Sequence, residues 1–302
     1  METSTTTDDD GESAGSFTFR IFFFTFIFLL ACSKTQKKNK AISLRIVQKI
    51  KSATKVDTPV AAKPVKKKKK IYLTFDDGPN KGTRNVLDIV QQEDIPVTFF
   101  IVGEHVFASR EQAMTWDSLL AAKNIEICNH SYTHALHNSY EKFYEKPDTV
   151  IKDMKQTQEK LLPDNNIVRA PGRNSWRIDS LQYTEIKKSK AAIDSLHKAG
   201  FTVMGWDLEW HYDPKTFTVK NTSDELLNQV DSVFNNNKTK VADNLVLLAH
   251  DQVYAKSNDS FQLREFIKKL KLKDDYELSL AKDYPGVIKT YPDSVKTKTT
   301  TQ

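Results

Sequence analysis

The stretch IYLTFDDGP, residues 71–79, decides the fold. Its first five residues are apolar or β-branched, which is typical of a buried strand, and the following Asp-Asp-Gly-Pro ends any regular element. A segment with apolar residues at helical spacing follows over 83–93, and a second strand-like run follows over 97–102. This order of strand, turn, helix and strand indicates two parallel strands joined by a helix.

The same alternation continues along the chain. We expect further helices over 116–123, 150–162, 187–199, 223–234 and 261–270, and further strands over 125–128, 167–168, 201–204, 245–248 and 276–280. Ser223 is expected to cap the helix that it begins, because its hydroxyl can accept a backbone hydrogen bond. Polar residues follow the ends of several predicted strands, and such ends meet on one face of a (β/α) barrel. The sequence therefore predicts an α/β barrel with a site on that face. The absence of a glycine-rich loop after the first strand argues against a dinucleotide enzyme.

The positive charge is concentrated outside this predicted fold. The chain of 302 residues has a net charge of +6, but residues 33–70 contain fourteen basic residues and one acidic residue. We expect 33–70 to be a flexible linker, 71–290 to form the barrel and 291–302 to be a disordered tail. The barrel is then close to neutral, so no nucleic-acid partner is expected.

Residues 1–32 are predicted to be a signal peptide. The apolar run over 21–31 would span roughly 16 Å as a helix, about half of a bilayer core. The sequence LLAC at 29–32 resembles the bacterial lipobox, in which the cysteine is lipidated. This resemblance implies an exported lipoprotein, anchored to a membrane through Cys32 on the periplasmic or cell-surface side. An ordinary signal peptide is the alternative.

Two histidines in HSYTH, His130 and His134, have a spacing that suits metal binding. On a helical turn, residues four apart place their imidazoles on one side. Together with one carboxylate they would form a three-ligand site with an open position, as in metal hydrolases. The expected ion is Zn²⁺, with Co²⁺ or Ni²⁺ as alternatives.

Five short motifs together resemble the NodB-type polysaccharide deacetylases, also called carbohydrate esterase family four. They stand in the order of that family: TFDDG at 74–78, HSYTH at 130–134, RAPG at 169–172, WDLEW at 206–210 and LAH at 248–250. The resemblance extends from about residue 70 to residue 284 and implies a distorted (β/α) barrel of seven or eight strands, the NodB homology domain. It also implies a metal-dependent hydrolase that removes N-acetyl groups from an extracytoplasmic polysaccharide of the peptidoglycan or chitin type.

The resemblance also assigns roles to the first two motifs. Asp77, His130 and His134 are expected to hold the divalent metal. Asp76 is expected to be the general base that takes a proton from the attacking water. Arg169 of the third motif is expected to pair with Asp76 and keep it ionised.

The remaining motifs are expected to serve the leaving group and the sugar. His250 would protonate the departing amine, supported by Glu209, in second place by Asp207, and in third place by Asp213. The backbone N–H of Gly172 would stabilise the oxyanion, although the family usually has a tyrosine at this position. Further substrate contacts are expected at Pro171, Leu248, Trp176, Trp206 and Trp210, and for each tryptophan a place in the core is an equal alternative.

Two other functions are compatible with these residues. The first is an O-acetyl esterase acting on a plant-type polysaccharide such as xylan, since an ester needs the same metal chemistry. The second is a glycan-binding protein without catalysis, in which the metal has a structural role.

Overall fold

The computed structural model describes residues 67–161 and 163–288. The predicted signal peptide with Cys32, the linker up to residue 66 and the tail over 291–302 lie outside the described residues, and their assignments stay predictions. The described residues lie within one compact unit. Among them the structure contains no helix that is both long enough and apolar enough to span a bilayer.

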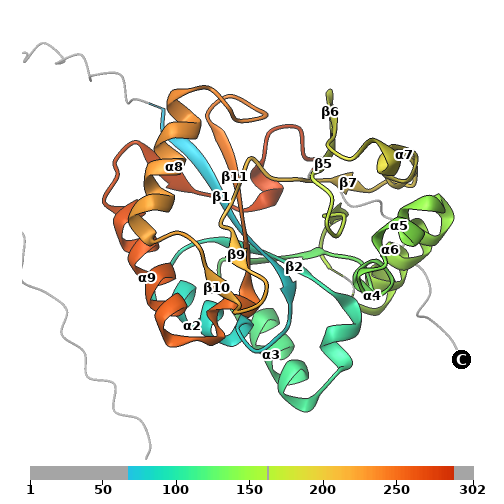
Figure 1. The fold of residues 1–302 in the computed structure, drawn as a ribbon, viewed down its shortest axis with the longest axis horizontal. Helices are drawn as coiled ribbons and strands as arrows, with labels where there is room; N and C mark the ends of the chain where they lie inside the picture. The colour runs from blue at the N-terminus through green and yellow to red at the C-terminus, as the bar shows by residue number, and fades with distance from the viewer. Residues whose placement is uncertain (1–66, 162, 289–302) are drawn as a thin grey trace, which may run out of the picture. The chain divides into compact units, whose positions relative to one another are not determined.

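The centre of the fold is a curled, mostly parallel sheet (Figure 1). Its strands follow the order β6-β5-β7-β4-β3-β2-β1-β11-β8, so β6 and β8 are its two ends and the sheet forms a half-barrel. All pairings from β7 to β8 along this order are parallel, whereas β5 is antiparallel to β6 and β7. The strands are β1 (Lys69–Gly78), β2 (Val97–Ile101), β3 (Ile125–Asn129), β4 (Ile167–Val168), β5 (Ser175–Ile178), β6 (Leu181–Thr184), β7 (Thr202–Val203), β8 (Leu208–Glu209), β11 (Asn244–His250) and β12 (Tyr276–Leu278), with a separate hairpin of β9 (Tyr212–Asp213) and β10 (Thr218–Val219).

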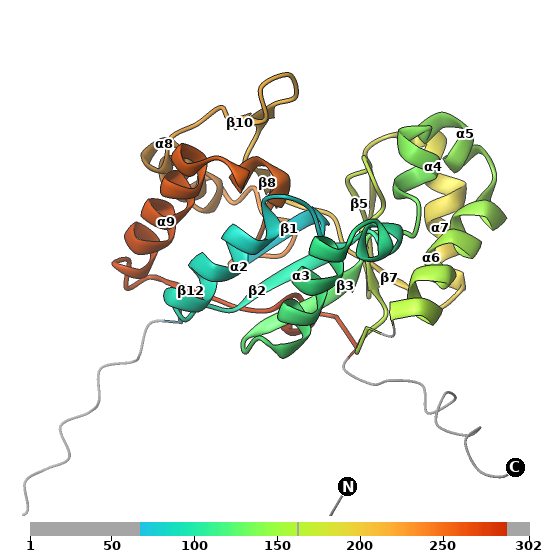
Figure 2. The same ribbon diagram turned by 90° about the horizontal axis from the view of Figure 1, so that it is seen from below.

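Helices cover the sheet in two groups (Figures 1 and 2). One group, with α2, α8 and α9, packs on the strands around β1, and the other, with α5, α6 and α7, packs near β4 and β7. The helices are α2 (Thr83–Gln92), α3 (Arg110–Ala121), α4 (His134–Asn138), α5 (Tyr140–Glu145), α6 (Pro147–Leu161), α7 (Lys190–Lys198), α8 (Ser223–Asn235) and α9 (Ser257–Lys271), with 3-10 turns η1 (Gly103–Phe107), η2 (Lys187–Ser189), η3 (Asp251–Ala255) and η4 (Ala281–Asp283).

Strand β1 is the central strand of the sheet. It pairs with β11 along one edge, and with β12 and then β2 along the other. Both faces of such a strand are buried, which explains its nearly continuous apolar sequence. Ile71, Leu73 and Phe75 pack under the helices, whereas Tyr72 packs inside the curl. Since side chains alternate along a strand, Asp76 points into the curl with Tyr72.

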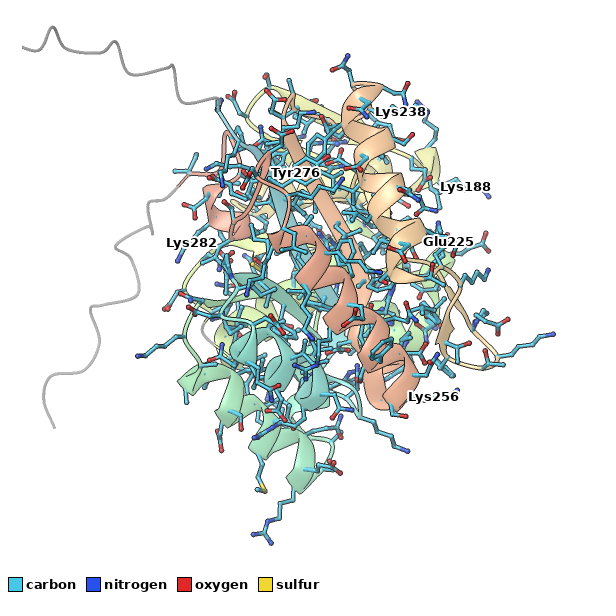
Figure 3. The ribbon with its side chains drawn as sticks, turned by 90° about the vertical axis from the view of Figure 1, so that its left-hand side faces the viewer. Lys188, Glu225, Lys238, Lys256, Tyr276 and Lys282 are labelled. Carbon is cyan, nitrogen blue, oxygen red and sulfur yellow. The ribbon has the colours of Figure 1, made fainter. Side chains whose placement is uncertain are left out.

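The predicted alternation of strands and helices is confirmed, and the differences are local. The helices predicted over 116–123 and 261–270 begin earlier, at Arg110 and Ser257. The expectation that Ser223 caps α8 is wrong. Thr222 is the N-cap, and its side chain and that of Glu225 accept each other's backbone N–H in a capping box (Figure 3 shows Glu225 on α8).

Candidate active site with a metal-binding cluster

Two neighbouring carboxylates at the end of β1 reach the same site because the strand is irregular there. In a regular strand Asp76 and Asp77 would point to opposite faces. The register between β1 and β2 shifts between Asp76 and Gly78, and Asp77 has a φ of 77°. Such a bulge redirects a side chain. As a result, Asp76 Oδ2 lies 3.7 Å and Asp77 Oδ1 lies 3.5 Å from the same atom, His130 Nε2.

The two histidines of the second motif lie on an irregular turn, not on the helical turn expected from their spacing. His130 follows β3 directly, and bends lead from it to His134. The carboxylate of Asp153 on α6 accepts hydrogen bonds from the backbone N–H groups of Tyr132 and Thr133, over 3.1 and 3.2 Å. These bonds to a side chain 20 or more residues away replace the local bonds of a helix.

Residues 134–138 form a left-handed turn. All five have positive φ values, between 46° and 68°, which is rare for residues other than glycine. The turn brings Asn138 back to His134, so that His134 Nδ1 lies 2.6 Å from Asn138 Oδ1. The same oxygen accepts a 2.8 Å hydrogen bond from the hydroxyl of Tyr140.

The three predicted metal ligands form a donor set that suits a divalent cation. One ligand atom each from Asp77, His130 and His134 lies within 4.8 Å of the others. His130 Nδ1 donates to the carbonyl of Arg169 over 2.9 Å, and His134 Nδ1 donates to Asn138. Each Nε2 is therefore the ring nitrogen left to bind a cation once it carries no proton. Within the described residues, buried Asp77 Oδ1 has no hydrogen-bond partner, although His134 Nε2 is 3.1 Å away. A cation would satisfy all three atoms at once.

The charges of this cluster bear on cation binding in two ways. Burial raises the pKa of Asp77, but His130, His134 and the nearby His250 outweigh it, so the pKa lies well below its ordinary value. Burial lowers the pKa of His134, but the Asp77 carboxylate raises it above its ordinary value. Because His134 must lose its Nε2 proton to bind a metal, cation affinity should depend on pH.

Asp76 forms a buried ion pair with Arg169. Arg169 Nη1 lies 2.7 Å from Asp76 Oδ1 and 2.8 Å from the hydroxyl of Thr74, and neither Arg169 nor Asp76 is more than 2% exposed. The guanidinium also packs on the ring of Phe100, with 4.0 Å between its carbon and the ring centre. The structure thus joins Arg169 to Asp76 as the sequence predicts.

His250, the last residue of β11, lies beside β1, where it pairs with Asp76 in the register of the two strands. Its ring centre is 5.0 Å from that of Tyr212. Within the described residues, His250 Nδ1 is buried without a hydrogen-bond partner. In the described part of the chain, the ring therefore packs against Tyr212, and no carboxylate binds its Nδ1.

The acids expected to support His250 have other partners. Asp207 accepts hydrogen bonds from the backbone N–H groups of Lys240 and Val246, over 2.7 and 2.9 Å, and burial raises its pKa to about 6. Glu209 pairs with His211, with 3.4 Å between Oε1 and Nδ1. Glu209 also belongs to β8, so it does not follow a strand end as expected. The third alternative, Asp213, accepts from backbone N–H groups of its own hairpin.

These side chains open into a pocket of about 570 Å³. Asp76, Asp77, His130, His134 and His250 all line it, as does Glu209. Three of the predicted substrate-site residues, Gly172, Leu248 and Trp206, line it as well. Because the lining comes from β1, β8, β11 and the loops after β3 and β4, the pocket lies at the carboxyl ends of the strands. The predicted contact at Pro171 does not line it.

Two of the three tryptophans belong to the core. Trp176 is fully buried inside the curl and Trp210 is 1% exposed under the helices, where its Nε1 donates to the carbonyl of Asn221. For both residues the core interpretation therefore holds, and the substrate contact expected of them does not. Trp206 is the tryptophan that lines the pocket.

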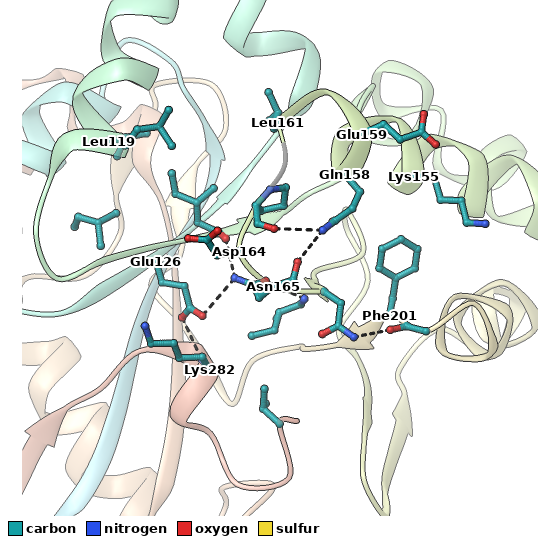
Figure 4. A pocket seen from close by; sticks show the side chains of 18 of the residues that line it. Leu119, Glu126, Lys155, Gln158, Glu159, Leu161, Asp164, Asn165, Phe201 and Lys282 are labelled. Carbon is teal, nitrogen blue, oxygen red and sulfur yellow. Dashed lines mark hydrogen bonds between the residues drawn. The ribbon is translucent and has the colours of Figure 1, made fainter. Parts of the chain in front are cut away.

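A larger pocket, of about 820 Å³, lies at the opposite ends of β3 and β4 (Figure 4). Its polar side chains are engaged with their neighbours: Asn165 donates to the carbonyl of Ile127, and Glu126 accepts from the backbone N–H of Lys282. Burial raises the pKa of Glu126. Nothing in this pocket matches the chemistry of the predicted motifs.

Sequence reasoning missed several residues around the site. Asp251, which follows His250, is fully buried and accepts from the side chains of Asn80 and Thr83. Tyr140 and Tyr212 line the pocket, but neither belongs to a predicted motif. The only signal for these two tyrosines is their place in the segments that follow the second and fourth motifs.

Comparison with known proteins agrees with the family resemblance. A family model described as polysaccharide deacetylase matches residues 63–203, which include the first three motifs and all three metal-ligand candidates. This part of the chain is similar to polysaccharide deacetylases. The resemblance predicted from the five motifs is thereby confirmed.

Curated relatives of this deacetylase domain share limited identity with it. A chitin disaccharide deacetylase of Vibrio alginolyticus is 24% identical over 200 residues, covering 46% of this chain and 47% of that protein. A peptidoglycan-N-acetylglucosamine deacetylase of Bacillus cereus is 28% identical over 155 residues, covering 49% and 50%. The chain thus spans about half the length of these relatives.

Solved structures confirm the fold of the deacetylase domain. The catalytic domain of a peptidoglycan N-acetylglucosamine deacetylase from Eubacterium rectale matches with a TM-score of 0.52 and 21% identity, covering 74% of this chain and 92% of that one. A family 4 carbohydrate esterase from Streptomyces lividans matches with a TM-score of 0.50 and 19% identity, covering 72% and 94%. The predicted α/β barrel is therefore confirmed, in the form of the curled half-barrel described above.

Proposed function

We propose that this domain is a metal-dependent hydrolase that removes N-acetyl groups from a polysaccharide containing N-acetylglucosamine. One observation carries the proposal: the Asp77, His130 and His134 cluster opens into the same pocket as Asp76 and His250. A cation-binding set, a separate carboxylate and a separate imidazole are the groups that amide hydrolysis requires. Relatives named as chitin and peptidoglycan deacetylases support this substrate class.

Each residue has a task that follows from its position. A divalent cation, when bound, polarises a carbonyl oxygen and acidifies water. Asp76 lies beside the cluster and does not belong to it, so its free oxygen can take a proton from the attacking water. Arg169 holds that carboxylate in place. His250 reaches the pocket from β11 and can protonate the leaving amine, which is a poor leaving group without a proton. The N–H of Gly172, at the rim of the pocket, can stabilise the oxyanion.

Acetate release tests the function directly. The described domain is incubated with N-acetylglucosamine oligomers and with peptidoglycan fragments, with Zn²⁺, Co²⁺ or Ni²⁺, and acetate and product masses are measured. We expect acetate only with a divalent cation, and none with a chelator or with Asp77→Asn. Asp88→Asn, which changes a half-exposed carboxylate paired with Arg84 on α2, is the matched control and should keep full activity. Acetate release that persists in excess chelator would refute the metal dependence.

An O-acetyl esterase on a polysaccharide such as xylan is the second candidate. The observation that favours it is His250, which has no acidic partner on Nδ1 within the described residues. An alkoxide leaves more easily than an amine, so an esterase depends less on a charged imidazole. A region of a bifunctional xylanase/deacetylase of Pseudobutyrivibrio xylanivorans is 36% identical to this chain over 66 residues.

The location of the protein is a separate proposal. The apolar run over 21–31 and the following Cys32 support export and lipid anchoring, which would place the enzyme near cell-wall or extracellular polysaccharides. Expression of the full chain and of Cys32→Ser, followed by membrane fractionation and mass spectrometry of the lipid-modified peptide, tests this. An unmodified Cys32 in the membrane fraction would contradict the anchor.

A further inference from the structure

The β9–β10 hairpin carries two aromatic side chains to the rim of the pocket. Tyr212 on β9 and Phe217 before β10 both line the pocket, and their rings stack with centres 6.0 Å apart and an interplanar angle of 19°. Tyr212 also neighbours His250, at 5.0 Å between ring centres. Tyr212 thus links the ring of Phe217 to His250 of the proposed reaction centre.

The hairpin that carries these rings is firmly held. Lys256 at the start of α9 donates from Nζ to the carbonyl of Thr216 (Figure 3 labels Lys256). The carboxylate of Asp259 accepts from the backbone N–H of Val219 over 3.1 Å. Inside the loop, Asp213 Oδ1 accepts from the backbone N–H groups of Lys215 and Thr216. Phe217 is therefore fixed on both sides.

Phe217 has two features that a surface turn does not need. Its φ is 48°, a conformation that is unfavourable for a bulky side chain and that glycine or asparagine would adopt more easily. Its side chain is also large and apolar, yet the residue is 43% exposed. Strained backbone that is held by its surroundings concentrates at functional sites, and an exposed apolar ring at a pocket suits a ligand.

Gln252 connects this aromatic pair with the cation-binding cluster. Its Nε2 lies 3.3 Å from the hydroxyl of Tyr212 and 3.4 Å from Asp77 Oδ2. The position of the Tyr212 ring is thereby set relative to Asp77. A ligand packed on the ring would be placed relative to the same cluster.

We propose that the Phe217–Tyr212 pair is a binding platform for a pyranose ring that neighbours the sugar being deacetylated. The C–H face of a pyranose packs on the face of an aromatic ring, whose electron density attracts it. The enzyme then favours a chain of several sugars over a short one. This inference rests on the proposed function for the identity of the sugar, but the platform itself requires only a polysaccharide ligand.

Binding without turnover tests the platform. An Asp76→Asn chain is titrated calorimetrically with N-acetylglucosamine oligomers of two to six units, and with acetylated xylo-oligosaccharides of the same lengths. We expect affinity to rise with length. Phe217→Ala should lower the affinity for the longer oligomers by roughly three- to tenfold and leave the dimer unchanged.

Matched variants separate the lost ring from a disturbed fold. Phe217→Gly removes the ring but suits the positive φ, so it should bind as weakly as Phe217→Ala without a lower melting temperature. Phe217→Tyr keeps an aromatic face and should keep the affinity. Phe261→Ala removes a 56% exposed ring from α9, away from the pocket, and should change nothing.

The outcomes distinguish the platform from the proposed function. Equal affinity of Phe217→Ala and its parent for all lengths overturns the platform, as does a failure of the parent to bind either oligosaccharide series. Binding that depends on Phe217, without acetate release by the chain that retains Asp76, supports the platform and overturns the proposed deacetylation. If the affinity depends on Phe217 for the xylo-oligosaccharides alone, the platform is supported, and its ligand is the substrate proposed for the esterase.

Discussion

Arg169 Nη1 lies 2.7 Å from Asp76 Oδ1, and both side chains are almost completely shielded from water. A buried pair of this kind adds little net stability, but removing one partner leaves an uncompensated charge. The pair also spans two motifs that are 93 residues apart in sequence. It therefore couples the position of the proposed base to the loop after β4.

We expect Arg169→Met to destabilise the domain by about 3–5 kcal/mol, because the Asp76 carboxylate stays buried without a partner. The double variant Asp76→Asn with Arg169→Met should recover a large part of that loss. Urea unfolding of the four members of the cycle measures both effects. A single Arg169→Met variant as stable as the parent would show that the pair does not bear on stability.

Asp76→Asn should lower the rate of acetate release by roughly 10²- to 10⁴-fold, because an amide cannot take the proton of the attacking water. The affinity for Zn²⁺ should stay the same, since Asp76 is outside the ligand set. Steady-state kinetics and metal titration are measured on the same preparation. A tenfold loss of Zn²⁺ affinity would instead make Asp76 a ligand.

His250→Ala separates the two proposed substrate classes. If the leaving group is an amine, the rate on an N-acetylated oligosaccharide should fall by about 10²- to 10⁴-fold, because the amine leaves unprotonated. The rate on an O-acetylated oligosaccharide should fall much less. Losses of equal size on both substrates would argue against the role of His250 as the acid.

Asn138→Ala should weaken Zn²⁺ binding by about tenfold, because His134 loses the acceptor that holds its proton on Nδ1. Asn138→Asp keeps an acceptor and should restore the affinity. Calorimetric metal titration measures the difference without reference to activity. Unchanged affinity in Asn138→Ala would mean that the left-handed turn alone positions His134.

The free energy of unfolding should fall as the pH rises between the pKa values of Asp251 in the unfolded and folded states. Burial raises the pKa of this carboxyl from 3.8 to about 8, more than the bonds from Thr83 and Asn80 lower it. Between these two values the folded state binds the proton and the unfolded state does not, so a higher pH favours unfolding. In chelator, the melting temperature should decrease from pH 6 to pH 9, and less so in Asp251→Asn. Parallel curves for the two chains would contradict this assignment.

Much of the fold follows from the hydrophobic pattern. In strand β1 and in helices α2, α6 and α8, the apolar residues follow one kind of secondary structure over many positions. The predicted ends of these elements agree with the structure within a few residues. Strands β8, β9 and β10 have two residues each, too few to show any period. The β9–β10 hairpin therefore cannot be predicted from the hydrophobic pattern, although it follows the fourth motif closely in the sequence.

The candidate site was predictable in its residues but not in its geometry. The ends of parallel strands meet, so Asp76, Asp77 and His250 were expected together. The left-handed turn at 134–138 was not foreseeable, because no glycine marks it. Its shape depends on distant partners such as Asp153, which no local pattern reveals. The position of Glu209 likewise depends on the pairing of β8 with β11, which no local sequence pattern predicts.

The register shift in β1 has a consequence for how this sequence can change over time. It lets two consecutive residues reach one place, where the proposed tasks are proton transfer for Asp76 and cation binding for Asp77. Deleting one residue between Thr74 and Gly78 would restore the regular pleat, and inserting one would shift the register again; either change would turn one of the two carboxylates to the other face of the sheet. Length is therefore constrained more strictly in these five positions than in any surface loop, where insertions are tolerated.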